Sequence, residues 1–463
     1  MSTVTISDTP FVGNDRLLVG IVLSVLTFWL FAQSVINVVP AMKSSLDISL
    51  ETLTLAVSLS ALFSGCFVVA SGGLADKFGR MRMTTLGLGL SIVGSAMLVI
   101  AQGPGLFLAG RVLQGLSAAC IMPATLALIK TWYEGRARQR AVSFWVIGSW
   151  GGSGLCSFVG GAIATGLGWR WIFVFSIAVA LLALVLLRGT PESRSASASQ
   201  HKLDVGGLLS LIAALVLVNL FISKGHGWGW SSPLSLTMLV GALAAGAVFI
   251  RNGMRKGEAA LIDFALFRNR AYGAAVLSNF LLNGAIGTMM IASIWLQQGH
   301  HLTPLESGMM TLGYLVTVLA MIRVGEKLLQ RYGARLPMMA GPVLTAIAIA
   351  LISCTFLDKA LYIGVVFASN VLFGLGLGCY ATPSTDTAVA NAPENKIGVA
   401  SGIYKMGSSL GGAMGIAVTA SLFALFLPLG MAHAAQYALW FNAVLCLGAM
   451  AVSALLLPRA SQS

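Results

Sequence analysis

The sequence predicts an all-α polytopic membrane protein with fourteen transmembrane helices, and three observations predict it. The 463 residues are 57% hydrophobic and only 9% charged, whereas a soluble globular domain carries roughly a quarter charged residues. Long apolar stretches follow one another from residue 17 to residue 457. Lysine and arginine gather in alternate loops between these stretches. A chain with this pattern crosses a bilayer many times, and each crossing must be helical because lipid cannot satisfy an open backbone.

Each crossing needs about 20 mainly apolar residues, and fourteen segments meet this requirement. The predicted spans are 17–42, 52–75, 83–102, 104–132, 139–166, 170–188, 205–223, 232–250, 271–298, 304–328, 337–357, 360–390, 398–424 and 434–457. The residues before the first span contain no short apolar core followed by a small-residue cleavage site, so we expect no cleaved signal peptide.

The net charge of +13 follows from topology, since the basic residues lie in loops after even-numbered spans. These are Lys77, Arg80, Arg82, Arg136, Arg138, Arg140, Arg188, Arg194, Lys202, Arg251, Arg255, Lys256, Arg268, Arg270, Arg331 and Arg335. The loops after odd-numbered spans carry single charges, such as Lys43 and Lys359. Lysine and arginine accumulate on the cytoplasmic side. We therefore expect both termini in the cytoplasm and no nucleic-acid partner.

Cysteine and histidine give no sign of a metal site. The six cysteines (Cys66, Cys120, Cys156, Cys354, Cys379 and Cys446) all lie inside predicted spans and lack the spacing of metal ligands. We expect them to be small packing residues. The pair His300-His301 lies in an outer loop, where a solvated loop is the simpler interpretation than a pH sensor.

An internal repeat predicts the domain organisation. The segment 326–335 is a degenerate copy of 72–81, and 373–379 echoes 114–120; each copy lies eight spans after the first. Two six-helix bundles with two inserted helices satisfy both echoes, which gives domains 1–195, 196–252 and 253–463. Duplicated halves around a site near the midplane are a transporter layout. Because one chain supplies both halves, we expect a monomer.

Two other segments lie between the predicted bundles. The stretch from Gly189 to Asp204 is Ser-rich and polar, as expected of a linker. The run Leu261–Phe267 lies between basic residues and predicts a short amphipathic segment at the membrane interface.

Several motifs identify a family. Gly73-Leu74-Ala75-Asp76-Lys77-Phe78-Gly79-Arg80 resembles the signature loop between the second and third helices of the major facilitator superfamily. Arg111-Val112-Leu113-Gln114-Gly115 is similar to the arginine motif of its fourth helix. The glycines of span five (Gly148, Gly152, Gly160 and Gly161) resemble its antiporter motif, although Cys156-Ser157 replaces the usual Gly-Pro pair. Trp169–Phe173 and Gly227–Pro233 are similar to segments of its fourteen-span drug:proton antiporters.

This resemblance implies the major-facilitator fold and proton-coupled efflux of amphipathic drugs, including fluoroquinolones and lipophilic monovalent cations. It implies a proton gradient, no bound cofactor and location in a bacterial inner membrane. The first-helix acid of many such pumps is replaced by Ala32, so a strong preference for divalent cations is not expected. Within the same fold, the alternatives are an exporter of one endogenous metabolite or an importer. A membrane enzyme or sensor would need a long polar domain or a catalytic constellation, and neither pattern occurs in the sequence.

The signature loop is a candidate inner gate. Asp76 lies near a helix end, where it can pair with Arg80 or cap the next helix start. Gly73 and Gly79 complete the predicted gating loop. The alternative is ordinary anchoring of the loop by its positive charges.

Charged residues inside spans are candidates for proton coupling because burying a charge in a membrane costs several kcal/mol. Asp386 and Lys405 lie about ten residues on either side of the loop centred near 395–396, which predicts matched depth and an ion pair. The alternative is a permanent structural pair. Arg111 lies about two turns from the outer end of span four and could assist. Glu326 lies near the inner surface, where an interfacial pair with Arg323 or Lys327 is the simpler interpretation.

Aromatic, methionine and amide side chains suggest a cavity for flat amphipathic molecules. The candidates are Trp29, Gln33, Asn37, Asn279, Asn283, Met290 and Tyr380. The alternative is that some of these side chains face lipid.

Overall fold

The fold is all-α and membrane-spanning, as the sequence predicts. The computed structural model describes residues 11–34, 42, 45–46, 50–194, 204–302 and 304–458. Each of the fourteen predicted spans contains helix, and these described residues contain no strand. Ten of their helices are long and apolar enough to cross a membrane. The helix positions are consistent with fourteen spans.

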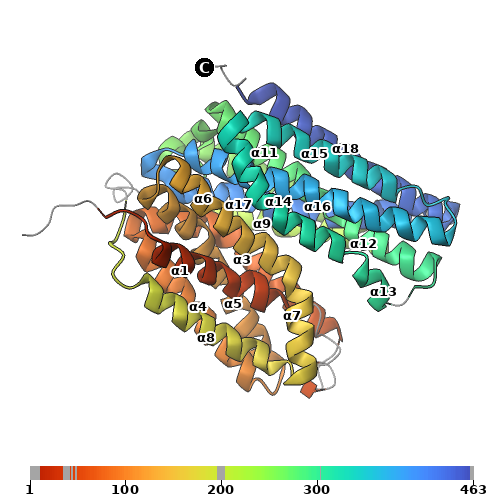
Figure 1. Ribbon diagram of the computed structural model, residues 1–463, viewed down its shortest axis with the longest axis horizontal. Helices are drawn as coiled ribbons and strands as arrows, with labels where there is room; N and C mark the ends of the chain where they lie inside the picture. Colours follow the sequence, from red (N-terminus) through yellow and green to blue (C-terminus); the bar gives the residue numbers. More distant parts are fainter. Residues whose placement is uncertain are drawn as a thin grey trace, which may run out of the picture.

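The first bundle comprises the helices of the first six spans, drawn in red to yellow in Figure 1. They are α1 (Asp15–Leu26), the π-helical turn η1 (Thr27–Phe31), the 3₁₀ turn η2 (Ala32–Ser34), α3 (Leu50–Phe78), α4 (Arg80–Ile100), α5 (Pro104–Trp132), α6 (Gly135–Val146), the π-helical turn η3 (Ile147–Gly151), α7 (Gly152–Gly166) and α8 (Arg170–Leu187). α5 lies at the centre of this bundle: it packs against α3 and α4 and is largely buried.

The second bundle is drawn in green to blue in Figure 1. Its elements are α11 (Arg270–Gly284), α12 (Gly287–Ile294), the π-helical turn η7 (Trp295–Gly299), α13 (Pro304–Met309), α14 (Leu312–Tyr332), α15 (Arg335–Ile352), α16 (Lys359–Ala390), η8 (Glu394–Lys396), α17 (Ile397–Phe426), η9 (Leu427–Leu429) and α18 (Met431–Leu456). α16 packs against α14 and α15, and α11 packs against α17 and α18.

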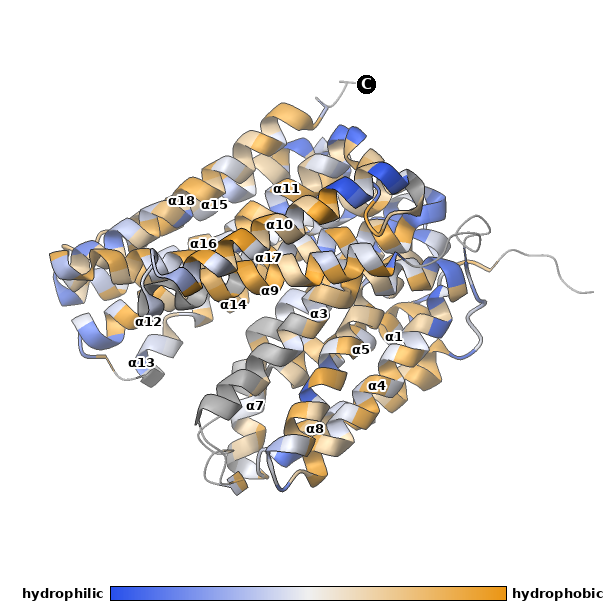
Figure 2. Cartoon of the chain, turned by 180° about the vertical axis from the view of Figure 1, so that it is seen from behind, coloured by the Kyte–Doolittle hydropathy of each residue, from blue (hydrophilic) through white to orange (hydrophobic). Residues whose placement is uncertain are grey.

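Two inserted helices, α9 (Val205–Trp228) and α10 (Pro233–Lys256), lie between the bundles in sequence. α9 contacts α10, α17 and α3, so it touches both bundles. α10 is mostly exposed: Leu236, Val240 and Leu243 are 47%, 63% and 65% exposed. Figure 2 shows this apolar face beside α9. In a bilayer these side chains contact acyl chains.

The two copies of the internal repeat occupy equivalent places. Gly79 ends α3 with φ 123°, and Gly333 ends α14 with φ 74°. Glycine adopts such positive φ values without the steric penalty that a Cβ imposes. Both copies therefore turn the chain sharply between the second and third helices of their bundle.

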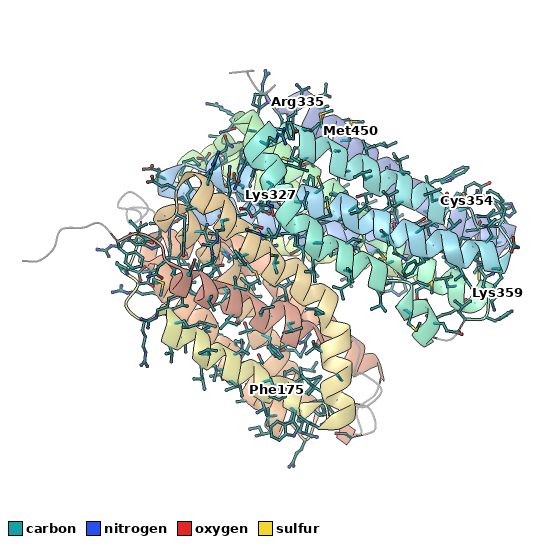
Figure 3. The ribbon with its side chains drawn as sticks, in the orientation of Figure 1. Phe175, Lys327, Arg335, Cys354, Lys359 and Met450 are labelled. Carbon is teal, nitrogen blue, oxygen red and sulfur yellow. The ribbon has the colours of Figure 1, made fainter. Side chains whose placement is uncertain are left out.

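The two bundles meet at one end of the molecule, which we call the basic end because it carries the Arg- and Lys-rich loops. Lys327 and Arg335 lie at this end in Figure 3, whereas Cys354 and Lys359 lie at the opposite end. α6 lies against α14 and α16 near the basic end, and the bundles diverge from there, so that α7 and α13 lie apart (Figure 1).

The segment between α10 and α11 folds onto the protein. Its 3₁₀ turns are η5 (Gly257–Ala259) and η6 (Phe264–Arg268). Leu261, Ile262 and Leu266 are 4–6% exposed. The apolar side chains of the predicted amphipathic piece pack against protein, because the bundle offers them a core; its place at the membrane interface stays a prediction.

Two carboxylates hold this segment in place. Asp204 caps α9 by accepting from Gly207 N at 2.9 Å, and it also accepts from Lys256 Nζ at 2.5 Å. Asp263 pairs with Lys396 at 2.6 Å. Burial alone would raise the pKa of each carboxyl, but the facing ammonium and backbone N–H groups hold both pKa values below the ordinary value. Both groups are therefore charged at neutral pH.

Candidate functional site

The signature loop contacts the other bundle. Asp76 accepts from Arg80 Nη2 at 3.0 Å, and the two side chains are almost completely buried. The same carboxylate accepts from the backbone N–H groups of Gly398 and Val399 at 3.0 and 3.1 Å. These belong to the first turn of α17, where unpaired N–H groups and the helix dipole favour a negative charge. Asp76 therefore caps a helix of the second bundle from the end of α3.

The sequence suggested that Asp76 could cap the next helix, α4, and this is corrected by the structure. Glu192 fills that role, since its two carboxylate oxygens accept from Met81 N and Arg82 N at 2.9 and 3.0 Å. Glu192 lies in the segment after α8. Because it accepts from the first N–H groups of α4, the Asp76 carboxylate is available to cap α17. The predicted pairing of Asp76 with Arg80 is confirmed.

The backbones of the two bundles touch beside this contact. A Cβ at Gly72 would overlap the carbonyl group of Gly398, and a Cβ at Gly398 would overlap Gly72 O. Gly73, which the sequence singled out, makes only ordinary contact, since its Cβ would lie 3.5 Å from Val399. The residue that permits the close approach is therefore Gly72, together with Gly398.

Asp386 pairs with Arg138 of the first bundle. Arg138 Nε lies 3.0 Å from Asp386 Oδ1, and the two side chains are 22% and 6% exposed. Lys130 adds a second link by donating to the carbonyl oxygens of Ala390 and Ala392, at the end of α16. A cation at a helix C-terminus is favourable because the last carbonyls lack partners there. Two basic residues of the first bundle thus hold the end of α16.

The predicted pair between Asp386 and Lys405 is wrong in this conformation. α16 ends at Ala390, which places Asp386 about 6 Å from the helix end, whereas Lys405 lies about 12 Å into α17. The loop between the helices is not symmetric about residue 395, so the two side chains do not share a depth. In the described chain, no carboxylate lies within ion-pair distance of Lys405.

Lys405 instead points at the first bundle. Its Nζ lies 4.9 Å from the ring centre of Trp145 on α6 and 5.6 Å from that of Trp29 on η1. The face of an aromatic ring attracts a cation through its quadrupole. A lysine of the second bundle therefore rests between two tryptophans of the first.

Glu326 forms the interfacial pair that the sequence suggested. It accepts from Arg323, and from Gln330 at 3.2 Å. The Arg323 guanidinium also lies 4.9 Å from the ring centre of Phe144 on α6. The pair therefore adds a cation–π contact between the bundles at the basic end.

Arg111 is fully buried within the first bundle and is not brought to Asp386. It donates to Ala56 O, Ala32 O, Gln114 Oε1 and Ser60 Oγ at 2.6–3.0 Å. It lies about 10 Å from the far end of α5, whereas Asp386 lies at the basic end. Arg111 joins spans one, two and four.

Comparison with known proteins decides the family. A model of the Major Facilitator Superfamily matches residues 17–273 and 271–462. The chain belongs to the major facilitator superfamily. It is 50% identical over 454 residues to the quinolone resistance protein NorB of Staphylococcus aureus strain MRSA252, and 51% identical to that of strain MW2; each match covers 98% of both chains. The sequence resemblance to this branch of the superfamily is confirmed.

Solved structures support the same fold. The proton:xylose symporter XylE superposes with a TM-score of 0.69 at 16% identity, covering 96% of each chain. The human organic anion transporter MFSD10 gives 0.63 at 16% identity, covering 95% of this chain and 98% of that one. A bacterial ferroportin homologue in the outward-facing state gives 0.64 at 14% identity, with the same coverage. Family membership makes the chain a multi-pass membrane transporter.

The antiporter glycines pack span five against span one of this facilitator. A Cβ at Gly148 would lie 3.3 Å from Val22, one at Gly152 would lie 3.1 Å from Trp29, and one at Gly160 would lie 2.6 Å from Ser34. Gly161 is different, because a Cβ there would have no described atom within 4 Å. Three of the four glycines therefore serve close packing of span five against span one.

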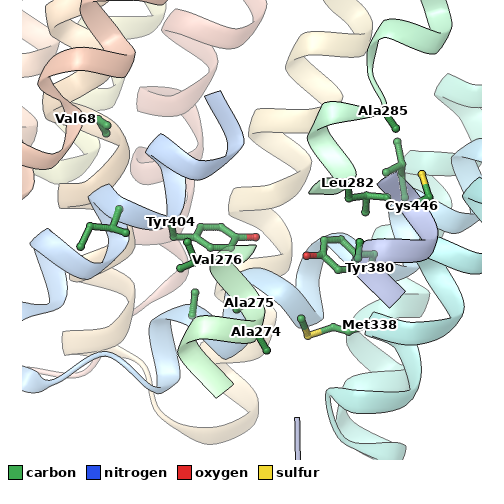
Figure 4. Close-up of a cluster of buried hydrophobic side chains, with 14 of the residues drawn as sticks. Val68, Ala274, Ala275, Val276, Leu282, Ala285, Met338, Tyr380, Tyr404 and Cys446 are labelled. Carbon is green, nitrogen blue, oxygen red and sulfur yellow. The ribbon is translucent and has the colours of Figure 1, made fainter. Parts of the chain in front are cut away.

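Two predicted cavity residues are corrected because they are enclosed within the second bundle. Tyr380 is 0% exposed, and its hydroxyl bonds Ser278 and Ser384 at 2.6 and 2.9 Å. Figure 4 shows it pointing into the core near Tyr404. Asn279 is 1% exposed and donates to Tyr404 O and Ser408 Oγ. Hydroxyl partners from α11, α16 and α17 explain this burial, since buried polar groups are retained where they are hydrogen-bonded.

The other predicted cavity residues differ in position. Asn283 is partly buried and donates to Asn279, and Met290 is partly buried against the core of the second bundle. Trp29, on the first bundle, lies within cation–π distance of Lys405 of the second. The Gln33 side chain and Asn37 lie outside the described residues.

Sequence reasoning missed several residues of the basic end. Arg138 was counted only as a topological charge, and Lys130 and Gly398 lay inside predicted spans without an assigned role. Gly72 appeared only as the first residue of the repeat copy 72–81. The alternation of basic loops located Arg138 at the correct end but could not show which carboxylate it meets. The first N–H groups of any helix need an acceptor. The predicted start of a helix at residue 398 was therefore the one sequence signal for a cap site at Gly398 and Val399.

Proposed function

We propose that this transporter is a proton-coupled exporter of amphipathic drugs, with quinolones and lipophilic monovalent cations among its substrates. The relationship to the quinolone resistance protein NorB, with 50% identity over nearly the whole of both chains, carries the substrate class. Aromatic side chains at the junction of the bundles, Trp29 and Trp145, offer flat apolar surfaces of the kind that amphipathic drugs bind.

Expression in a pump-deficient bacterial host tests the substrate class. We expect expression of the chain to raise the inhibitory concentrations of norfloxacin and of ethidium by at least about fourfold, because efflux lowers the drug concentration inside the cell. The measurement is growth inhibition across a panel that also contains a neutral hydrophobic antibiotic. Unchanged sensitivity to every compound would contradict the proposal and leave an exporter of one metabolite as the alternative.

Proton coupling is proposed to act at Asp386. Its carboxylate holds Arg138 when the basic end is closed, and protonation removes the negative charge that makes this pair. A protonated Asp386 therefore weakens the closure and favours opening of the basic end. Release of the proton to the cytoplasm and binding of drug would then precede re-formation of the pair. No cofactor takes part, and the proton gradient supplies the energy.

We propose that the basic end faces the cytoplasm of a bacterial cell, so that both termini lie on the cytoplasmic side of the inner membrane. The basic loops support this orientation, and closure of that end leaves the transporter facing outward. Because one chain supplies both bundles, it functions as a monomer. Reporter fusions at residue 463 and near His300 are expected to report inside and outside respectively; the opposite pattern would reverse the orientation.

A further inference from the structure

Lys405 has unused capacity to bind an anion. It lies on α17 about 12 Å from the basic end, its side chain faces the first bundle, and the residue is 7% exposed. A desolvated cation–π contact returns less free energy than it costs to take an ammonium out of water. The two rings therefore only partly compensate the burial of this charge.

A second donor beside Lys405 also lacks a partner. Trp29 Nε1 is buried, and no acceptor bonds it among the residues that the structure describes. Trp145 differs, because its Nε1 donates to Thr125 Oγ1 at 2.9 Å and fixes its ring. The π-helical turn Thr27–Phe31 carries Trp29, and such turns often occur at functional positions. Among the described residues, two donors lie here and no carboxylate is within ion-pair distance of Lys405, an arrangement that is complementary to an anion.

We propose that Lys405 and Trp29 bind the carboxylate of an aromatic amphipathic substrate, with the Trp145 ring as the apolar wall beside it. This inference rests on the proposed function and deepens it, since it assigns the carboxylate of zwitterionic and anionic drugs to a named site. The ammonium would donate to one carboxylate oxygen and the indole N–H to the other. A charge-assisted hydrogen bond of this kind is stronger than a neutral one.

The position of the site also explains how a bound carboxylate is released. Lys405 belongs to the second bundle and both tryptophans belong to the first, so the distance between them depends on how the bundles meet. In the closed arrangement of the basic end, the rings occupy the surroundings of the ammonium. The Trp145 ring, the nearer of the two at 4.9 Å, competes with the carboxylate for Lys405, which lowers affinity for the substrate in the state that faces outward.

The test compares norfloxacin with its methyl ester, which keeps the aromatic rings and the amine but loses the carboxylate. Binding to the purified full-length chain in lipid nanodiscs is measured at pH 7.5. We expect the wild type to prefer the acid by about tenfold, as one charge-assisted contact predicts. Lys405→Gln is expected to reduce this preference to near one, and Lys405→Arg to retain it. Lys359→Gln removes an exposed lysine at the opposite end and is expected to behave as wild type.

Each outcome decides between the proposals. Equal affinity of the wild type for acid and ester, or a preference that persists in Lys405→Gln, would overturn the carboxylate site while leaving drug export intact. A wild type that neither binds nor exports either compound would overturn the proposed function itself. If Lys405→Gln does not elute as a monodisperse protein, the wild-type comparison of acid and ester still decides, because it requires no variant.

Discussion

Asp386→Asn is expected to abolish proton-driven drug efflux while leaving drug binding partly intact. The substitution leaves Arg138 without its counter-charge between the bundles. Breaking a buried pair from one side costs about 3 kcal/mol, which is roughly a hundredfold shift in an equilibrium. Because the pair exists when the basic end is closed, this shift favours opening. The measurement is norfloxacin accumulation in proteoliposomes with and without an imposed pH gradient.

Reciprocal variants separate coupling from folding. Arg138→Gln is expected to shift the conformational equilibrium in the same direction as Asp386→Asn. The double neutral variant, Asp386→Asn with Arg138→Gln, is expected to restore expression without restoring the response to the gradient, since no titratable carboxyl remains there. A double neutral variant that still responds to the pH gradient as wild type does would make the pair structural, and Glu326 would be the next candidate.

Gly398→Val is expected to prevent closure of the basic end and to reduce efflux at least about tenfold. A side chain at this position would overlap Gly72 O and lie 2.9 Å from the Asp76 carboxylate. Both neighbours are fixed, one as helix backbone and the other by Arg80 and the start of α17. Overpacking of a tight contact costs typically 1–3 kcal/mol, and here it destabilises the closed state relative to the open one. The measurement is ethidium efflux from energised cells.

Gly89→Val provides the matched control for this prediction. Gly89 lies on α4, and a Cβ there would have nothing within 4 Å. The same glycine-to-valine change in a helix interior therefore tests propensity without the clash. Efflux by Gly398→Val at the level of Gly89→Val would show that the backbone contact between α3 and α17 is dispensable.

The helices could be predicted because the features that define each span are local in the sequence. Apolar length and the alternation of basic loops depend on neighbouring residues, and the predicted span 104–132 coincides with α5 (Pro104–Trp132). Pairing between helices depends instead on where each helix ends. The end of α16 was predicted correctly at residue 390, but a loop centre placed near 395–396, instead of midway between Ala390 and Ile397, gave Asp386 and Lys405 the same depth. One helical turn changes depth by about 5.4 Å, which exceeds the length of an ion pair.

Contacts between the bundles could not be predicted for a different reason. Asp76 meets Gly398, more than 300 residues away, through backbone N–H groups that carry no side-chain signature. The sequence placed Asp76 near a helix end in the signature loop, but its partner helix follows from how the two bundles assemble. Tyr380 and Asn279 were misassigned because their polar groups find partners inside one bundle, and residue type alone does not distinguish a lined cavity from a hydroxyl network.

The distance between the bundles at the basic end, measured as a function of pH, tests the proposed coupling most directly. Spin labels at Ala137 and Arg331, both exposed at that end, report it in a cysteine-free background. We predict that acidification lengthens this distance in the wild type, because protonation of Asp386 releases Arg138. In Asp386→Asn we predict the longer distance at every pH. A distance that does not change with pH in the wild type, in a preparation that exchanges drug for protons, would contradict the proposed role of this pair.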